Sequence, residues 1–181
     1  MRRSGFKGLV AAGIVATSIA ASTTAVAASD MFLKLSGVQG ESQDSKHKNE
    51  IDVLSWSWGA STGTGKTKRG TVPPACIQDL SLTKFVDSAS PAFIMMTVLG
   101  QMAPDATLTV RKSGETPNEF FILRMTNVSI TSYQTGGSEG ETRLTENVTL
   151  HFDQLKGEYR PQKADGSSGS PILFDISGAC P

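Results

Sequence analysis

Hydrophobic and polar residues alternate along most of the chain after residue 30, and this pattern predicts short β-strands. The clearest example is the run from residue 51 to 58, whose alternation divides the residues between two faces. We expect the face that carries the tryptophans to be core, and the face that carries Ser55 and Ser57 to meet water or a partner. The two expected faces are Leu54, Trp56 and Trp58 on one side, and Val53, Ser55 and Ser57 on the other.

Similar patterns predict further strands with turns between them. The run from 119 to 133 slips phase near Asn127, which predicts a bulge there. The expected strands are 31–38, 51–58, 77–85, 107–112, 119–133, 142–159 and 172–176.

One segment, residues 88–102, has the pattern of a helix. Ser90 suits the N-cap, Pro91 the first helical position, and Gly100 falls near the end. We expect the apolar residues of this helix to pack on the sheet. They are Phe93, Ile94, Met95, Met96, Val98, Leu99 and Met102.

Together these elements predict a single mainly β domain, a barrel or sandwich of about eight antiparallel strands with one flanking helix. Residues 59–74 form a long loop of glycine, threonine and lysine that ends in two prolines. A loop of this length without an apolar anchor is unusual in a compact domain and is typical of a functional segment.

The first 27 residues have the pattern of a secretory signal peptide. Arg2, Arg3 and Lys7 are followed by an apolar stretch and by Ala25-Val26-Ala27, a small-x-small cleavage pattern. The alternative is a membrane anchor, but the apolar stretch is short and rich in small residues. We expect cleavage after Ala27 without stable membrane insertion, and residues 28–181 as the mature domain. The expected location is secreted or periplasmic.

Composition and charge narrow the class of partner. The chain has 17 basic and 17 acidic residues, and 38% of its residues are hydrophobic. This balance is typical of a globular protein and does not indicate a nucleic-acid partner.

Cys76 and Cys180 are the only cysteines. Export places them in an oxidising compartment, where one intramolecular disulfide is an option and two free thiols are the alternative. Two cysteines with two distant histidines do not make a metal site.

Catalytic motifs are not apparent. His47 and His151 lack the accompanying residues of a nucleophile or metal motif. The segment 63–67, Gly-Thr-Gly-Lys-Thr, resembles part of a phosphate-binding loop, but Ala60 stands where the first glycine belongs and no helix follows. We therefore expect no catalytic, cofactor-binding or metal residues, and no enzyme.

Eight segments in order along residues 30–177 form a linked set of motifs. They are Asp30-Met31-Phe32-Leu33-Lys34, Gly40-Glu41-Ser42-Gln43-Asp44, residues 51–59, Gln78-Asp79-Leu80-Ser81, Ala89-Ser90-Pro91, residues 108–112, Ser132-Tyr133-Gln134 and residues 159–166. Together these segments resemble the haemolysin-coregulated protein (Hcp) family, the tube subunits of type VI secretion systems.

The resemblance implies a homo-oligomeric ring of six copies, stacking of rings into a hollow tube, and small secreted effectors in the lumen. It places Ser55 and Ser57 toward the lumen. It also implies that the loop bearing Thr62, Lys66, Lys68 and Arg69 reaches the adjacent ring.

The signal peptide conflicts with the cytoplasmic assembly that the family implies. Two hypotheses therefore stay open: a tube subunit, or an exported Hcp-fold module that binds or supports other molecules outside the tube.

Overall fold

The computed structural model describes residues 29–62, 75–113, 117–140 and 142–177, and this part of the chain contains ten strands and one helix. The predicted signal peptide lies outside the described residues. The elements are β1 (Ser29–Leu35), β2 (Ile51–Ser57), β3 (Ala60–Thr62), β4 (Ala75–Ile77), β5 (Leu80–Phe85), α1 (Ser90–Leu99), β6 (Met102–Lys112), β7 (Asn118–Gly136), β8 (Thr145–His151), β9 (Gln154–Tyr159) and β10 (Ile172–Ser177).

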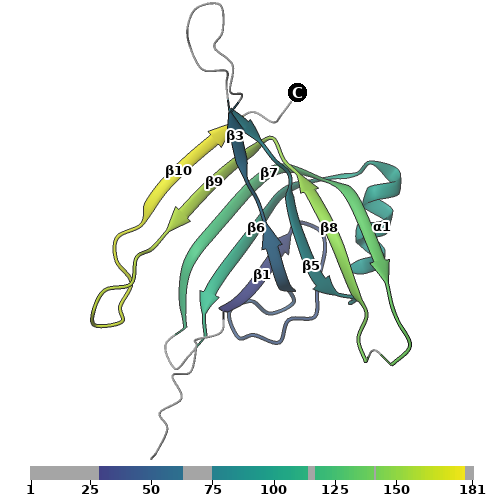
Figure 1. The fold of residues 1–181 in the computed structure, drawn as a ribbon, viewed down its shortest axis with the longest axis horizontal. Coiled ribbons are helices and arrows are strands. Elements are labelled where there is room, and N and C mark those ends of the chain that lie inside the picture. The colour runs from purple at the N-terminus through teal and green to yellow at the C-terminus, as the bar shows by residue number, and fades with distance from the viewer. Residues whose placement is uncertain (1–28, 63–74, 114–116, 141, 178–181) are drawn as a thin grey trace, which may run out of the picture.

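Six strands form a closed antiparallel barrel in the order β7-β6-β1-β2-β5-β8, after which β8 pairs again with β7 (Figure 1). The 19-residue strand β7 closes the barrel because its first part pairs with β6 and its last part with β8. The bulge predicted near Asn127 falls further along β7, between Ile130 and Ser132, and Asn127 itself has a φ of 53°. The predicted mainly β barrel with one flanking helix is confirmed.

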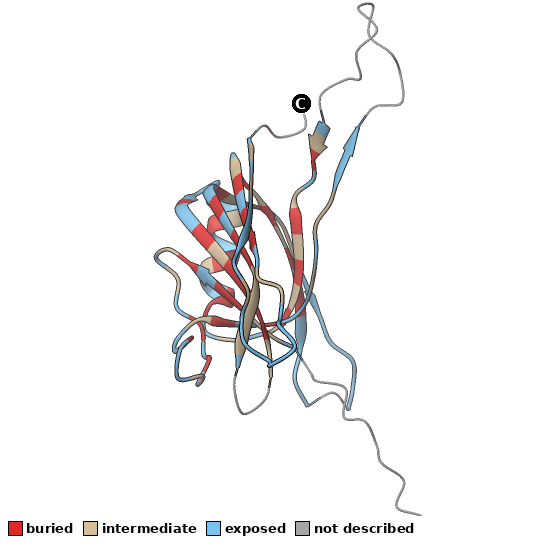
Figure 2. Cartoon of the chain, turned by 90° about the vertical axis from the view of Figure 1, so that its left-hand side faces the viewer, coloured by how far each residue is buried: buried red, intermediate tan, exposed pale blue. Residues whose placement is uncertain are grey.

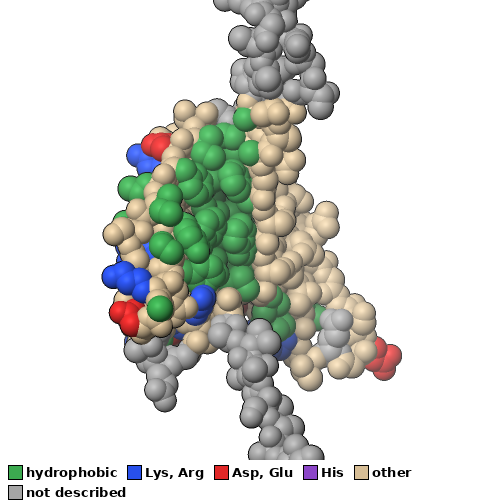
Figure 3. Space-filling model, turned by 60° about the vertical axis from the view of Figure 1, so that its left-hand side comes forward, with side chains coloured by type: hydrophobic (Ala, Val, Ile, Leu, Met, Phe, Trp, Pro, Cys, Tyr) green, Lys and Arg blue, Asp and Glu red, His purple; other side chains and the backbone are tan. Residues whose placement is uncertain are grey.

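Strands β9 and β10 extend the sheet beyond the barrel, and we call this pair the wing. β9 pairs with the first part of β7, and among the described strands β10 pairs only with β9. The expected strand 142–159 is therefore two strands, divided at Phe152 and Asp153, and the expected strand 77–85 divides at Gln78 and Asp79. Figure 3 shows that apolar side chains line the hollow between the wing and β2, the strand that leads into the β3–β4 hairpin.

The core lies inside the barrel, because the inward residues of its strands are apolar. In β5, for example, Leu80 and Leu82 are buried while Ser81 and Thr83 are partly exposed. Figure 2 shows this alternation of buried and exposed residues along the barrel strands, and the β3–β4 hairpin reaching beyond them. Alternation in the sequence thus reports the inside and outside of the barrel.

The two predicted faces of the run 51–58 need a correction. The register between β2 and β5 shifts between Val53 and Ser55, so that Val53 is buried and Leu54 is exposed. The bulge moves the alternation by one residue, which turns Leu54 out of the barrel. Trp56 and Trp58 are partly buried against the core, and Ser55 and Ser57 are exposed.

The helix is shorter than predicted, and less of it is buried. Its N-cap is Ala89, and Ser90 is the first helical residue, while Gly100 ends the helix in a left-handed conformation with a φ of 63°. Phe93 and Met96 pack into the core, but the other predicted core residues are exposed. These exposed residues are Ile94, Met95, Val98 and Leu99 in the helix, and Met102, which belongs to β6.

Candidate functional site

Two rows of uncharged polar side chains cross four strands on the outside of the barrel. Strand register aligns the rows, because residues that pair across antiparallel strands point to the same side of the sheet. The first row is Ser57, Ser81, Thr149 and Ser132, and the second row is Ser55, Thr83, Asn147 and Gln134, from β2, β5, β8 and β7. We call these eight residues the polar face.

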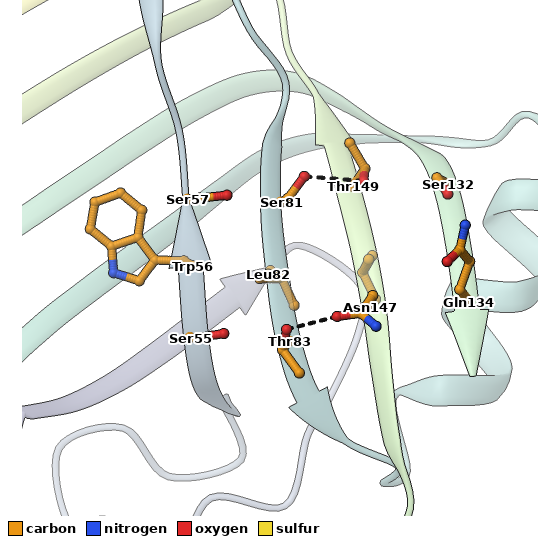
Figure 4. Close-up of a pocket in the computed structure, with 11 residues that line it drawn as sticks. Ser55, Trp56, Ser57, Ser81, Leu82, Thr83, Ser132, Gln134, Asn147 and Thr149 are labelled. Atoms are coloured by element: carbon orange, nitrogen blue, oxygen red, sulfur yellow. Dashed lines mark hydrogen bonds between the residues drawn. The ribbon is translucent and has the colours of Figure 1, made fainter. Parts of the chain in front are cut away.

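The polar face lines a shallow hollow of ≈ 290 Å³ (Figure 4). One hydrogen bond between strands lies within each row: Thr83 Oγ1 donates to Asn147 Oδ1 at 2.7 Å, and the hydroxyl oxygens of Ser81 and Thr149 are 3.3 Å apart. Trp56, between the two serines of β2, points to the other side of the strand. A second hollow of ≈ 340 Å³, lined by residues such as Gln134 and Asn147, continues the face toward the end of β7.

Among the described residues, charged groups lie at the two ends of the polar face. At one end, His151 Nδ1 and Thr131 Oγ1 lie within 2.9 Å of the carboxylate of Asp79. At the other end, the guanidinium of Arg143 lies 3.8 Å from the centre of the Phe85 ring. The residues that line the hollow therefore offer hydroxyl and amide groups and carry no charged side chain.

A buried ionic network lies beneath the polar face and fixes the register that aligns its rows. Lys84 pairs with Glu146 across β5 and β8, next to the pair of Thr83 and Asn147. Tyr133 of β7 donates its hydroxyl to the other oxygen of Glu146 at 2.6 Å. Burial, together with this hydrogen bond to a carboxylate, raises the pKa of Tyr133 to about 12.

Sequence patterns found only part of this surface. Ser55 and Ser57 lie on the polar face, while the other six residues were missed. Their signal was present, because Ser81 and Thr83 alternate with leucines, and Asn147 and Thr149 alternate with apolar residues. What was missing was the strand register that brings the four segments together.

The predicted stacking loop is only partly described. Strands β3 and β4 pair as a hairpin, and Thr62 is exposed at its end. Lys66, Lys68 and Arg69 lie outside the described residues. Cys76 of β4 is disulfide-bonded, but Cys180 lies outside the described residues, so its pairing with Cys76 stays a prediction.

The two histidines take part in separate interactions. The ring of His47 stacks on Phe32 with 4.2 Å between ring centroids, and its Nδ1 lies 2.8 Å from Glu50. His151 belongs to the Asp79 pair at the margin of the polar face. In the described part of the chain, no three metal-ligating side chains lie together, and no helix has the length and apolarity needed to cross a membrane.

A closed antiparallel barrel with one flanking helix, a projecting hairpin and an outer face of uncharged polar side chains defines a small β-barrel domain. Residues 32–159 match the family model described as "Type VI secretion system effector, Hcp". The chain is 45% identical over 149 residues to protein hcp1 of Pseudomonas aeruginosa, a match that covers 80% of this chain and 92% of that protein. The chain therefore belongs to the Hcp family of type VI secretion system proteins.

Solved structures of the same family have the same fold. Hcp1 from Salmonella typhimurium is 33% identical, with a TM-score of 0.67, and the match covers 83% of this chain and 94% of that one. A type VI secretion system effector from Yersinia pestis is 31% identical, also with a TM-score of 0.67, and the match covers 82% of this chain and 100% of that one.

Proposed function

We propose that this chain is the structural tube-forming subunit of a type VI secretion system. Six copies form a ring, rings stack into a hollow tube, and the polar face of each copy lines the lumen. The observation that carries the proposal is the alignment of eight uncharged polar side chains on one outer face of a barrel from this family.

The chemistry of the polar face suits a passage for cargo. A wall of one charge would hold oppositely charged proteins and repel others, because charged clefts concentrate the field. Hydroxyl and amide groups form hydrogen bonds that water can replace at little net cost. Small secreted effector proteins of different charge can therefore occupy such a lumen, and the proposed role requires no catalytic group.

The β3–β4 hairpin suits contacts between rings. It projects beyond the barrel, and Thr62 is exposed where the hairpin leaves the described residues. Lys66, Lys68 and Arg69 follow in the sequence and provide positive charge for a contact with the adjacent ring. We therefore assign stacking to this loop.

The test is the mass of residues 28–181 in solution at high protein concentration, measured by light scattering, together with negative-stain images. The expected result is a mass of six chains and ring-shaped particles with a central hole. A single-chain mass at the highest concentration would refute the tube proposal.

A second candidate is an exported Hcp-fold module that acts outside the tube. The signal-peptide pattern of residues 1–27 favours it, because a periplasmic chain cannot load onto a cytoplasmic assembly. Mass spectrometry of the protein from its natural source identifies its first residue and so distinguishes the two candidates. A chain that begins at Ala28 supports the exported module. A chain that retains residues 1–27 supports the tube subunit.

A further inference from the structure

Two residues continue the polar face with titratable groups. Asp79 directly precedes β5, two residues before Ser81, and His151 ends β8, two residues after Thr149. Residues two apart in a strand point to the same side, so both side chains follow the first row of the polar face on the outside of the barrel. The register of β5 and β8 places them opposite one another. We call Asp79 and His151 the charged pair.

The charged pair is positioned from three segments of the barrel. His151 Nδ1 lies 2.9 Å from one carboxylate oxygen of Asp79, and Thr131 of β7 donates its hydroxyl to the other oxygen at 2.9 Å. An ionised carboxylate only accepts hydrogen bonds, so Nδ1 carries a hydrogen and Nε2 is the ring nitrogen that can take up a further proton. Both side chains are 33% exposed, so water and a ligand can reach them.

Among the described residues, no other charged side chain forms a hydrogen bond or ion pair with His151. The residues beside it on β7 are Ser129, its cross-strand partner, and Thr131, and both are uncharged. Asp153, beyond the end of β8, is exposed and accepts a hydrogen bond from Asn127. The pair therefore carries one negative charge when the imidazole is neutral and none when it is protonated. Histidine is the side chain whose charge ordinarily changes between pH 5 and pH 8.

The charged pair is the place where the lumen wall of the proposed tube can select cargo by charge, because the eight residues of the polar face carry none. In a ring of six copies, six charged pairs lie at one level around the lumen. With neutral imidazoles this level is negative, and a passage lined by one sign of charge concentrates the opposite sign. A segment rich in lysine or arginine can contact several pairs at once, which strengthens contacts that are weak singly.

We propose that the charged pair binds basic segments of cargo proteins in the lumen, and that protonation of His151 releases them. The inference rests on the proposed tube function, and it names the chemistry of the cargo and the control of its release. At neutral pH and above, the carboxylate of Asp79 attracts lysine and arginine side chains. In acid, the imidazolium of His151 places a positive charge beside each carboxylate, and the attraction is lost.

Rings of residues 28–181 and a fluorescein-labelled peptide of six lysines test this contact by fluorescence anisotropy. The buffer has low salt, because salt screens contacts between exposed charges. The peptide should bind at pH 8 and about tenfold more weakly at pH 5, since several exposed contacts are lost together.

Variants of the pair separate its charge from its structure. His151→Asn keeps a hydrogen-bond donor for Asp79 but cannot take up a proton, so it should bind the peptide equally at both pH values. His151→Lys places a permanent positive charge in the pair, and Asp79→Asn removes the carboxylate, so each should bind weakly at both. Asp105→Asn is the matched control, because Asp105 is exposed on β6 outside the polar face, and it should behave as the unaltered chain. Thermal unfolding shows whether each variant is folded, and the two His151 variants decide if Asp79→Asn is not.

Light scattering at both pH values shows whether the rings persist. With rings present, three results would overturn the contact: no binding of the peptide at pH 8, unaltered binding by Asp79→Asn or His151→Lys, and a pH difference that persists in His151→Asn. Rings that dissociate at pH 5 would assign the release to disassembly and overturn its control by His151. A single-chain mass at both pH values would instead overturn the proposed tube together with this contact.

Discussion

The ammonium of Lys84 on β5 lies 2.7 Å from a carboxylate oxygen of Glu146 on β8, and both side chains are fully buried. Lys84 also contacts Asp87 at 2.7 Å and the carbonyl oxygen of Phe85 at 2.8 Å. The ammonium is thus surrounded by acceptors, as a buried charge requires. Since Lys84 and Glu146 are a cross-strand pair, their contact opposes any slip between β5 and β8.

Removing this ammonium should destabilise the barrel strongly. In Lys84→Met, the buried carboxylate of Glu146 loses its cation, and the loss of one partner of a buried pair costs about 3–5 kcal/mol. Urea unfolding of the two chains measures the difference in the free energy of unfolding.

The matched control for this pair is Lys156→Met, whose ammonium forms an exposed 3.7 Å pair with Asp175. It should cost less than about 1 kcal/mol. The double variant Lys84→Met with Glu146→Gln should recover part of the loss. Equal effects of Lys84→Met and Lys156→Met would show that burial of the pair does not matter.

Gly157 has no room for a side chain, because the ring of Phe174 lies on its backbone. In Gly157→Ala, a Cβ would meet the Phe174 ring at 1.8 Å, and the ring would have to leave the sheet. We expect a loss of about 1–3 kcal/mol, as for other overpacked sites. Chemical denaturation measures it.

Gly136→Ala is the control, since nothing lies within 4 Å of its added Cβ. In a Phe174→Ala background, the penalty of Gly157→Ala should largely disappear. If the penalty persists there, the Phe174 ring is not its cause.

Asp44 makes the stability depend on acid pH. Its hydrogen bond to Arg111, at 2.7 Å, holds the pKa of the carboxyl well below its usual range. In the unfolded chain, an aspartate carboxyl has a pKa near 4. Because the pKa of Asp44 is lower in the folded chain, its ionised carboxylate stabilises the fold above about pH 4. This contribution is lost as the pH falls further toward the pKa of the folded state. Asp44→Asn should be less stable at pH 7 and should lose less additional stability between pH 5 and pH 2.5.

Denaturant midpoints across this pH range measure the effect of Asp44. Asp52→Asn is the control, because Asp52 is exposed and no hydrogen bond or ion pair of its side chain is found among the described residues. The explanation fails if Asp44→Asn and the unaltered chain lose stability in parallel.

The disulfide of Cys76 should stabilise the mature chain. If its partner is Cys180, the closed loop of about 100 residues contributes about 4–5 kcal/mol in the chain-entropy model. Reduction and Cys76→Ser should each lower the denaturant midpoint. Mass spectrometry after alkylation, with and without prior reduction, identifies the bond. We expect both cysteines to stay unalkylated unless the protein is first reduced. Free thiols in the oxidised protein would contradict the prediction.

The sequence by itself determined most strands, the helix and the family. Alternation works because a strand turns successive side chains to opposite faces, so Leu80 and Leu82 indicate a buried side without any partner. Pro91 and Gly100 likewise limited the helix, because their backbone preferences are local.

Only the tertiary structure decided where those faces lie relative to one another. The bulge after Val53 reversed the expected side of Leu54, and the polar face required Ser57, Ser81 and Thr149 to align across strands far apart in the sequence. Likewise, the apolar pattern of α1 identified a helix but could not show that Val98 stays exposed, since exposure depends on what else packs there. Register, bulges and coverage are set by contacts between distant segments, whereas periodicity describes one segment at a time.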